Sequence, residues 1–211
     1  MKSTMTRWNN NINLLFLIKI FLIYFIFIFK FFSSYADNEN SLIAIGSNDA
    51  KVKIKIYSSF TCPHCANFHK QVVPEIKKNY VDTGKVQLIF MDFPLDQAAF
   101  NASKILHCIE QNKQIGFLDT IYETQNQWTD GSNINEINVN LKKIVKSLGI
   151  TSSRFDKCVN NKDIEDKILN ARIDGHQKYS INSTPTIIIN EKKLEGSVSF
   201  KNIKKKIEKL I

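Results

Sequence analysis

The run Cys62-Pro63-His64-Cys65 lies where the sequence changes from a strand pattern to a helix pattern, and no other segment limits the fold as much. Before it, Val52, Ile54 and Ile56 alternate with lysines, which is the two-residue period of a strand. After it, apolar residues recur with helical spacing at Phe68, Val72, Val73 and Ile76. Pro63 suits the first turn of a helix, where its missing N–H costs nothing. The chain must therefore place both sulfurs at the junction of a buried strand and a helix.

This position gives the two sulfurs different chemistry. At the start of the helix, exposed N–H groups and the positive end of the helix dipole favour the Cys62 thiolate, and a protonated His64 would add to the effect. We therefore expect Cys62 to be the reactive sulfur and Cys65 to be the shielded, resolving one. Because a stabilised thiolate stabilises the reduced form, the pair is expected to donate its disulfide rather than to reduce others.

Other uses of the two cysteines stay open at this point. A zinc site could combine Cys62 and Cys65 with His64 or His69, although no second pair of ligands follows at finger spacing. Haem attachment would need a histidine directly after Cys65, where the sequence has alanine. An inert structural disulfide is a further alternative, but its short loop would stabilise the chain little.

Residues 1–36 have the composition of a targeting segment, with four basic residues, no acidic residue and seven of the fifteen Phe. The apolar stretch from Ile12 to Phe32 is followed by Ser34-Tyr35-Ala36, with small residues at the positions that signal peptidase requires. We expect a signal peptide over residues 1–36, cut after Ala36. The alternative is an uncleaved anchor in the inner membrane, since 21 residues can span a bilayer. Either interpretation places the remaining chain outside the cytoplasm, in the periplasm.

Without that segment, the formal net charge falls from +9 to +5, and all four cysteines remain. An even number of cysteines in an exported chain is typical of an oxidising compartment. Of the 29 basic residues only three are arginine, and the lysines form no patch with interleaved aromatic residues. The composition therefore argues against nucleic-acid binding.

The remaining periodicities complete an α/β pattern. Strands are predicted at Leu42–Ile45, on a sheet edge, and at Val86–Phe93, so that strand, helix and strand form a βαβ unit. A long helical stretch follows, in which helical spacing or a stop signal marks Ala98–Ile109, Leu141–Gly149, Phe155–Val159 and Asp163–Lys178. The chain is expected to end with a strand at Thr186–Asn190, a turn at Glu191-Lys192, a strand at Lys193–Glu195 and a helix at Phe200–Leu210.

Three segments together resemble the DsbA-like branch of the thioredoxin superfamily. They are Ile45–Ala50, Phe60–Cys65 and Ser183–Thr186. The resemblance implies a thioredoxin fold formed by residues 37–96 and 173–211, with an α-helical lobe at 97–172 inserted between the βαβ unit and the strand of the cis-proline. The 119 residues between Cys65 and Pro185, far more than the framework needs, agree with such an insertion.

The resemblance also assigns roles to residues outside the dithiol. Pro185 would be a cis-proline facing the two sulfurs, and Thr184 and Pro63 would contact the substrate peptide. Some relatives carry a second disulfide in the lobe, which here would join Cys108 to Cys158. Two buried free thiols remain the alternative for that pair. Many relatives have an acid six positions before the first active-site cysteine, whereas this chain has Ile56 there, so no buried acid is assigned.

The expected function is that of an exported thiol:disulfide oxidoreductase that introduces disulfides through Cys62 and Cys65. Its partners would be reduced substrate proteins and, by resemblance, a membrane quinone-linked oxidase of the DsbB type. We expect a monomer without cofactor or metal. A disulfide isomerase or reductase is the alternative within the superfamily, although isomerases usually carry an N-terminal dimerisation domain. A metal-binding module that uses the two thiols and His64 is the alternative from another class.

Two further sets of residues are expected to be structural. The histidines His69, His107 and His176 are interpreted as surface or core residues, because they lack ligand spacing. Phe117 and Trp128 are expected in the core of the helical lobe.

Overall fold

The structure is a computed structural model that describes residues 42–211, of which Ile43–Ile211 form one compact unit. The expected signal peptide and its cleavage site lie outside the described residues. Among the helices of residues 42–211, none combines the length and the apolar character needed to cross a membrane.

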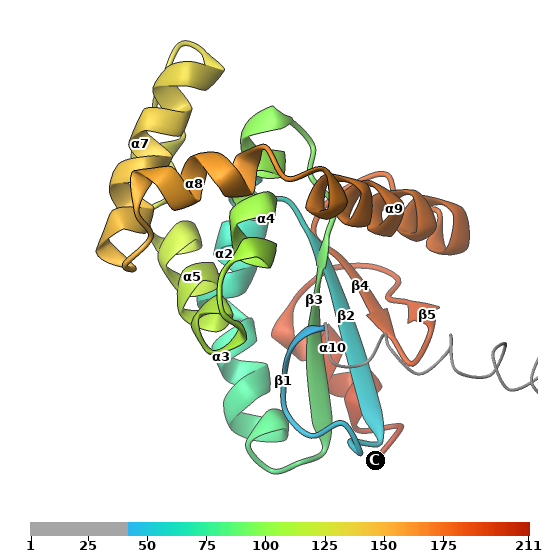
Figure 1. Cartoon of the computed structure of the whole chain (residues 1–211). Helices are drawn as coiled ribbons and strands as arrows, with labels where there is room; N and C mark the ends of the chain where they lie inside the picture. Colours follow the sequence, from blue (N-terminus) through green and yellow to red (C-terminus); the bar gives the residue numbers. More distant parts are fainter. Residues whose placement is uncertain (1–41) are drawn as a thin grey trace, which may run out of the picture. The chain divides into compact units, whose positions relative to one another are not determined.

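One mixed sheet organises the described residues, with its strands in the order β1-β3-β2-β4-β5 (Figure 1). The strands are β1 (Ile43–Ile45), β2 (Val52–Ser58), β3 (Val86–Asp92), β4 (Thr186–Ile189) and β5 (Lys192–Lys193). Only β2 and β3 run parallel, and β1, β4 and β5 each pair antiparallel with their neighbours. The edge position of β1 and the parallel pair agree with the sequence-based expectation.

Helices surround this sheet. They are α2 (Pro63–Gln71), α3 (Val73–Ile76), α4 (Gln97–Cys108), α5 (Gln111–Glu123), α6 (Gln125–Trp128), α7 (Ile134–Ser147), α8 (Ser152–Val159), α9 (Lys162–Tyr179) and α10 (Phe200–Ile207), with a π-helical segment η1 (Lys77–Val81) after α3. The helical segment between β3 and β4 thus ends at Tyr179, and the lobe boundary expected at residue 172 falls inside α9.

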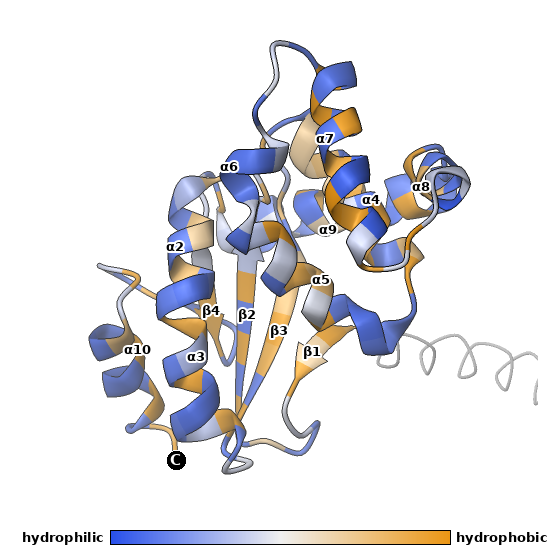
Figure 2. Ribbon diagram, turned by 90° about the vertical axis from the view of Figure 1, so that its left-hand side faces the viewer, coloured by the Kyte–Doolittle hydropathy of each residue, from blue (hydrophilic) through white to orange (hydrophobic). Residues whose placement is uncertain are grey.

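The two faces of the sheet are covered by different helices. Figure 2 shows α2, α3 and α10 on one side of the sheet, and the alternating colours of β2 follow its alternation of apolar residues and lysines. The inward residues Val52, Ile54 and Ile56 are at most 2% exposed and pack in one cluster with residues of these helices. The opposite face carries a smaller cluster, which contains Tyr57, Phe93, Ile181 and Ile188.

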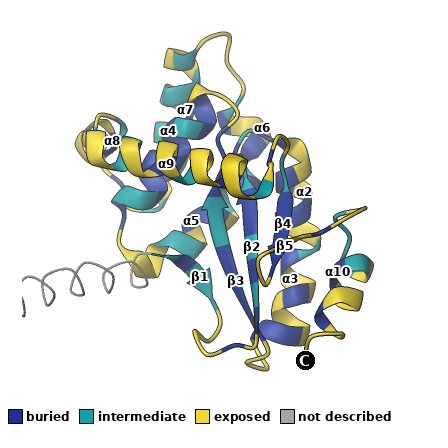
Figure 3. Ribbon diagram, turned by 90° about the vertical axis from the view of Figure 1, so that its right-hand side faces the viewer, coloured by how far each residue is buried: buried dark blue, intermediate teal, exposed yellow. Residues whose placement is uncertain are grey.

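Helix α9 approaches the second face closely because residue 175 is glycine. A Cβ atom at Gly175 would lie 2.7 Å from Cε1 of Tyr57, which is closer than real side chains approach. Most of the outer surface of α9 is exposed, whereas the central strands are buried (Figure 3). A substitution at Gly175 would therefore push the end of the lobe away from β2.

The lobe has its own core, which continues to the active-site cysteines. Phe117 and Trp128 are completely buried in it, as expected, and Cys62 and Cys65 belong to the same cluster. The stop predicted at Gly149 is also observed, since α7 ends at Ser147 and Gly149 has a φ of +80°.

One predicted turn is displaced. The hairpin turn consists of Asn190 and Glu191, with φ values of +44° and +66°, rather than of Glu191 and Lys192. Lys192 already pairs with Ile189 in the sheet. Two-residue hairpins favour positive φ at both turn positions, and asparagine tolerates this conformation better than most residues, so the turn begins one residue earlier than predicted.

Candidate active site: the dithiol at the start of helix α2

Cys62 and Cys65 lie at the connection between β2 and α2. The strand ends at Ser58, a short loop follows, and Cys62 is the N-cap of the helix that begins with Pro63. No side chain caps this helix end, and its first turn holds no acidic residue. The helix dipole therefore acts on the Cys62 sulfur without a competing negative charge from α2.

The two sulfurs differ in their surroundings. Both cysteines are free thiols, with Cys62 8% exposed and Cys65 1% exposed. Burial raises the pKa of Cys65 to about 12, and the Cys62 charge acts in the same direction, whereas Thr184 and the backbone of Ser59 oppose it. Cys65 is therefore a protonated, shielded thiol at neutral pH.

The loop before β4 closes the site from the other side. The peptide bond between Thr184 and Pro185 is cis. Cys62 Sγ donates a hydrogen bond of 3.3 Å to the carbonyl oxygen of Thr184. The Thr184 hydroxyl is buried without a hydrogen-bond partner of ordinary geometry among the described residues. Thr184 and Pro185, which are 119 residues or more from the dithiol in sequence, thus lie against it in the fold.

The residues between the two cysteines point outward. Pro63 and His64 are both exposed, so they form part of the surface that a partner protein would meet. Within residues 42–211, no group of three or more histidine, cysteine or acidic side chains is placed to hold a metal ion.

A buried glutamine that the sequence did not indicate holds the active-site loop. Gln125 Nε2 donates hydrogen bonds to the carbonyl oxygens of Phe60, at 2.7 Å, and Cys62, at 3.1 Å. Gln125 begins α6 and is 5% exposed. Nothing in the sequence near Gln125 signals this contact, because it joins positions more than 60 residues apart.

The same loop is attached to the loop that precedes α4. Thr61 Oγ1 donates a 2.6 Å hydrogen bond to Asp96 Oδ2, and Asp96 also caps α4 by accepting from the N–H of Ala99. The backbone N–H of Leu95 donates to Ser59 Oγ at 3.2 Å. These contacts fix the active-site loop from the lobe side and from the end of β3.

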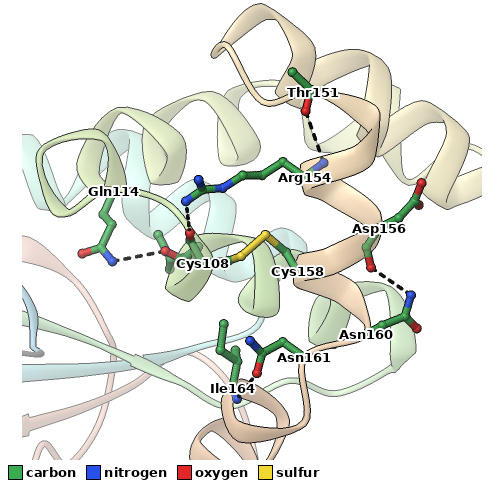
Figure 4. The surroundings of a disulfide bond; sticks show 10 residues. Cys108, Gln114, Thr151, Arg154, Asp156, Cys158, Asn160, Asn161 and Ile164 are labelled. Carbon is green, nitrogen blue, oxygen red and sulfur yellow. Dashed lines mark hydrogen bonds between the residues drawn. A yellow bond between two sulfur atoms is a disulfide. The ribbon is translucent and has the colours of Figure 1, made fainter.

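Cys108 and Cys158 are joined by a disulfide that connects the end of α4 to α8 (Figure 4). Their Cα atoms are 5.6 Å apart, which is in the usual range for a bridge. Arg154 of α8 donates a 2.7 Å hydrogen bond to the carbonyl oxygen of Cys108, so a second contact ties the same two helices together. This bridge is separate from the dithiol, whose two cysteines are free.

Of the three histidines outside the Cys62–Cys65 motif, two form buried or partly buried pairs with acids. His107 Nε2 lies 2.5 Å from Asp92 Oδ2, and His69 Nε2 lies 2.8 Å from Asp119 Oδ1. His176 Nδ1 is instead 2.9 Å from the carbonyl oxygen of Ile181. The expectation that these residues are surface or core histidines therefore agrees with their positions, although it gave no hint of the two acidic partners.

A dithiol at a helix start, facing a cis-proline on a βαβ-containing sheet, defines the site of a thiol:disulfide oxidoreductase with a thioredoxin fold. A family profile described as Thioredoxin matches residues 38–209. The chain belongs to this family, and the expected fold is confirmed.

Relatives and solved structures agree with this assignment. The "Probable disulfide bond formation protein D" of Bacillus anthracis is 29% identical over 170 residues, covering 79% of this chain and 76% of that protein. A "Putative protein-disulfide oxidoreductase" of Rickettsia bellii is 27% identical over 175 residues, covering 82% of this chain but 66% of that longer protein. The crystal structure of Wolbachia pipientis alpha-DsbA1 is 30% identical, with a TM-score of 0.73, and the match covers 80% of this chain and 90% of that chain.

Proposed function

We propose that this protein is a DsbA-like oxidase that introduces disulfides into exported proteins through Cys62 and Cys65. The observation that carries the proposal is the contrast between the two sulfurs: Cys62 lies at an uncompensated helix N-terminus beside the cis-proline loop, and Cys65 is buried behind it. The names of the relatives, as disulfide bond formation proteins and protein-disulfide oxidoreductases, support the same activity.

The reaction is an exchange of sulfur–sulfur bonds. A substrate thiolate attacks Cys62 of the oxidised protein, the Cys62–Cys65 bond breaks, and its electron pair leaves on Cys65. A second substrate thiolate then attacks the substrate sulfur of the mixed disulfide, and Cys62 leaves as a thiolate. The substrate loses two electrons, which the dithiol gains. The helix dipole favours this direction because it stabilises the departing Cys62 thiolate.

The neighbouring residues have separate roles in this proposal. Thr184 and Pro185 would align the substrate backbone beside Cys62, and the exposed Pro63 would contact it from the opposite side. His64 would stabilise the Cys62 thiolate when it is protonated. The disulfide between Cys108 and Cys158 would stabilise the lobe without exchanging with substrates.

Location and partners follow from the same chemistry. A protein that gives up its disulfide must be reoxidised, and a membrane quinone-linked oxidase of the DsbB type would accept the two electrons. The basic and apolar residues 1–36 support export to the periplasm as a signal peptide. We propose that the protein works there as a monomer, with a thioredoxin domain from residues 37–96 and 173–211 around a helical lobe at 97–172.

The proposal is tested by two assays with the purified protein. The first follows the loss of free thiols and the return of activity in a reduced multi-disulfide substrate, and the second follows the unscrambling of a misoxidised one. We expect rapid oxidation and weak unscrambling. Cys62→Ser should abolish oxidation, and Cys65→Ser should do so too because it removes the transferable disulfide. Oxidation that survives Cys65→Ser, or strong unscrambling with weak oxidation, would contradict the proposal. Cys108→Ala/Cys158→Ala serves as the control that keeps the dithiol.

A further inference from the structure

A buried acid–histidine pair joins the end of β3 to α4, and the exchange of sulfurs does not by itself require it. Asp92, at the end of β3, is 8% exposed, and the side chain of its partner His107 on α4 is 11% exposed. Burial alone would raise the pKa of Asp92, but the charge and hydrogen bond of His107 hold it below the usual value, helped by Ser103 and Lys167. Asp92 is therefore a carboxylate that accepts the hydrogen bond of His107 Nε2, and the two side chains are similarly buried, with 9% and 11% of their surface exposed.

A small cavity lies beside Asp92 and is lined by residues of β2, β3, α4 and α5. Its volume is about 10 Å³, which is the lower limit for one water molecule, and Asp92, Ser58 and Tyr122 supply its polar lining. Ile56 lines it as well. Because β2 and β3 are parallel, Ile56 lies beside Phe90, and Ser58 lies beside Asp92. The carboxylate of Asp92 thus reaches, from the neighbouring strand, the same cavity that residue 56 faces.

Tyr122 lines this cavity and belongs to the same core cluster as the resolving cysteine Cys65. Burial, followed by the charge of Cys65, holds the pKa of Tyr122 well above its usual range, and Asp92 and Cys62 act in the same direction. Ser58, beside the hydroxyl, lowers it. The Tyr122 hydroxyl therefore stays protonated at neutral pH, and the side chain lines the same cavity as Asp92, which suits a group that passes a proton on.

The proposed exchange requires a path for the proton of Cys65. When the Cys62–Cys65 bond breaks, Cys65 leaves as a buried thiolate, and the pKa of about 12 means that it must take up a proton. When the protein is reoxidised, the same thiol must lose that proton before it can attack. Residue 56, which lines the same cavity from β2, is isoleucine and cannot carry a proton.

We propose that Asp92 and His107 move the proton of Cys65, through the water-sized cavity and the Tyr122 hydroxyl. During substrate oxidation the proton of the His107–Asp92 hydrogen bond passes to the cavity, Tyr122 takes it up as its own hydroxyl proton moves to the Cys65 thiolate, and His107 takes up another proton from solvent. During reoxidation each transfer runs in reverse. The inference rests on the proposed function, and it deepens the account of the same site.

Another acid–histidine pair offers a competing route. His69 lies on α2, one turn after Cys65, and its ring packs 4.8 Å from the ring of Tyr122. Its Nε2, however, is bonded to Asp119, whose side chain is 56% exposed at the surface. His69 contacts the face of the Tyr122 ring and does not line the cavity, so the geometry favours Asp92.

The step is measured by oxidising the reduced full-length protein with glutathione disulfide. Acid quenching and mass spectrometry separate the mixed disulfide at Cys62 from the final Cys62–Cys65 disulfide. Formation of the mixed disulfide depends on Cys62, whereas its resolution depends on deprotonation of Cys65. We expect Asp92→Asn to leave formation unchanged and to slow resolution at neutral pH by at least about tenfold, so that the mixed disulfide accumulates. Resolution should then rise about tenfold per pH unit, since only hydroxide removes the proton.

Three further variants make the result decisive. Tyr122→Phe keeps the ring against Phe60 and His69 and removes only the hydroxyl, and His107→Gln removes the proton store, so both should slow resolution as Asp92→Asn does. Lys104→Met breaks a comparably buried pair on the same helix, with Glu165 at 2.6 Å, and should resolve the mixed disulfide at the wild-type rate.

The inference is overturned if the mixed disulfide fails to accumulate in Asp92→Asn and Tyr122→Phe, if it accumulates equally in Lys104→Met, or if only His69→Asn slows resolution. A wild-type protein that resolves glutathione normally but does not oxidise reduced proteins would contradict the proposed function instead. The two failures are therefore distinguishable.

Discussion

Removing the hydrogen bonds of Gln125 should loosen the active-site loop. In Gln125→Leu, the Cys62 carbonyl oxygen would keep the N–H of Ala66, at 3.1 Å, as a donor. Among the described residues, the Phe60 carbonyl oxygen accepts from Gln125 alone. One buried acceptor is therefore left unpaired, which costs about 1–3 kcal/mol. A loss near the middle of this range would lower the melting temperature by roughly 4–8 °C for a domain of this size.

The measurement is the free energy of unfolding in urea, together with the rate at which an alkylating reagent modifies Cys62. We expect Gln125→Leu to be less stable and to expose Cys62 to faster modification. Gln114→Leu is the matched control, because Gln114 Nε2 donates a 3.2 Å hydrogen bond to the Leu106 carbonyl and none to the active-site loop. Gln114→Leu should change the free energy of unfolding and the rate of Cys62 modification less than Gln125→Leu does. Equal stability and equal Cys62 modification in Gln125→Leu and the wild type would refute the role of this side chain.

Three other outcomes follow from the structure. Cys108→Ala/Cys158→Ala should lose up to about 4 kcal/mol in a urea titration, because a bridge across 50 residues of sequence restricts the unfolded chain, while substrate oxidation persists. The reduced protein should lose stability as pH rises above 9 toward 12, because the native state holds the Cys65 proton more tightly than the unfolded state does. The oxidised protein has no Cys65 thiol to titrate, so the melting temperatures of the two forms should diverge above pH 9. Hydrogen bonds from Lys178, Lys55 and Tyr179 lower the pKa of Glu191 from 4.5 to about 2, so its contribution is present above pH 4.5 and lost as pH falls toward 2. Glu191→Gln should flatten that acid limb of the stability profile, by a small amount since the side chain is half-exposed.

Each of these has a clear contrary result. A double alanine variant as stable as the wild type would show that the lobe does not depend on the bridge. Parallel pH profiles of the reduced and oxidised proteins would mean that Cys65 is not held protonated by burial. An acid limb that is identical in Glu191→Gln and the wild type would assign the acid sensitivity to other carboxylates.

The sequence predicted the parts of the fold that depend on local periodicity. Alternating lysines identified β2, and Pro63 marked the start of α2, because these signals act within a few residues. The division between α5 and α6 was not predicted, since no glycine or proline separates them. The break occurs at Thr124, whose hydroxyl bonds back to the carbonyl oxygen of Thr120, and such a contact leaves no pattern in the sequence.

The residues of the candidate site also fall into those that the sequence indicated and those that it did not. Cys62, Cys65 and Pro185 were indicated by short motifs, and the fold brings them together. Gln125 was not indicated, because its role depends on a contact between α6 and a loop that precedes it by more than 60 residues.

Asp92 is an intermediate case, because the sequence contained a signal for it. β3 was predicted as a buried strand parallel to β2, and the carboxyl ends of parallel strands meet at one edge of a sheet. A polar residue that ends β3 must therefore lie near the loop that carries Cys62, and Asp92 is the only acidic residue in Val86–Phe93. Its partner could not be inferred, since His107 comes from α4 and meets Asp92 only through the packing of the lobe on the sheet. Proton transfer to a buried thiol requires a carrier near the sulfur and not at one fixed position. Because residue 56 of β2 is isoleucine, the proposed carrier lies on the adjacent strand β3, at Asp92.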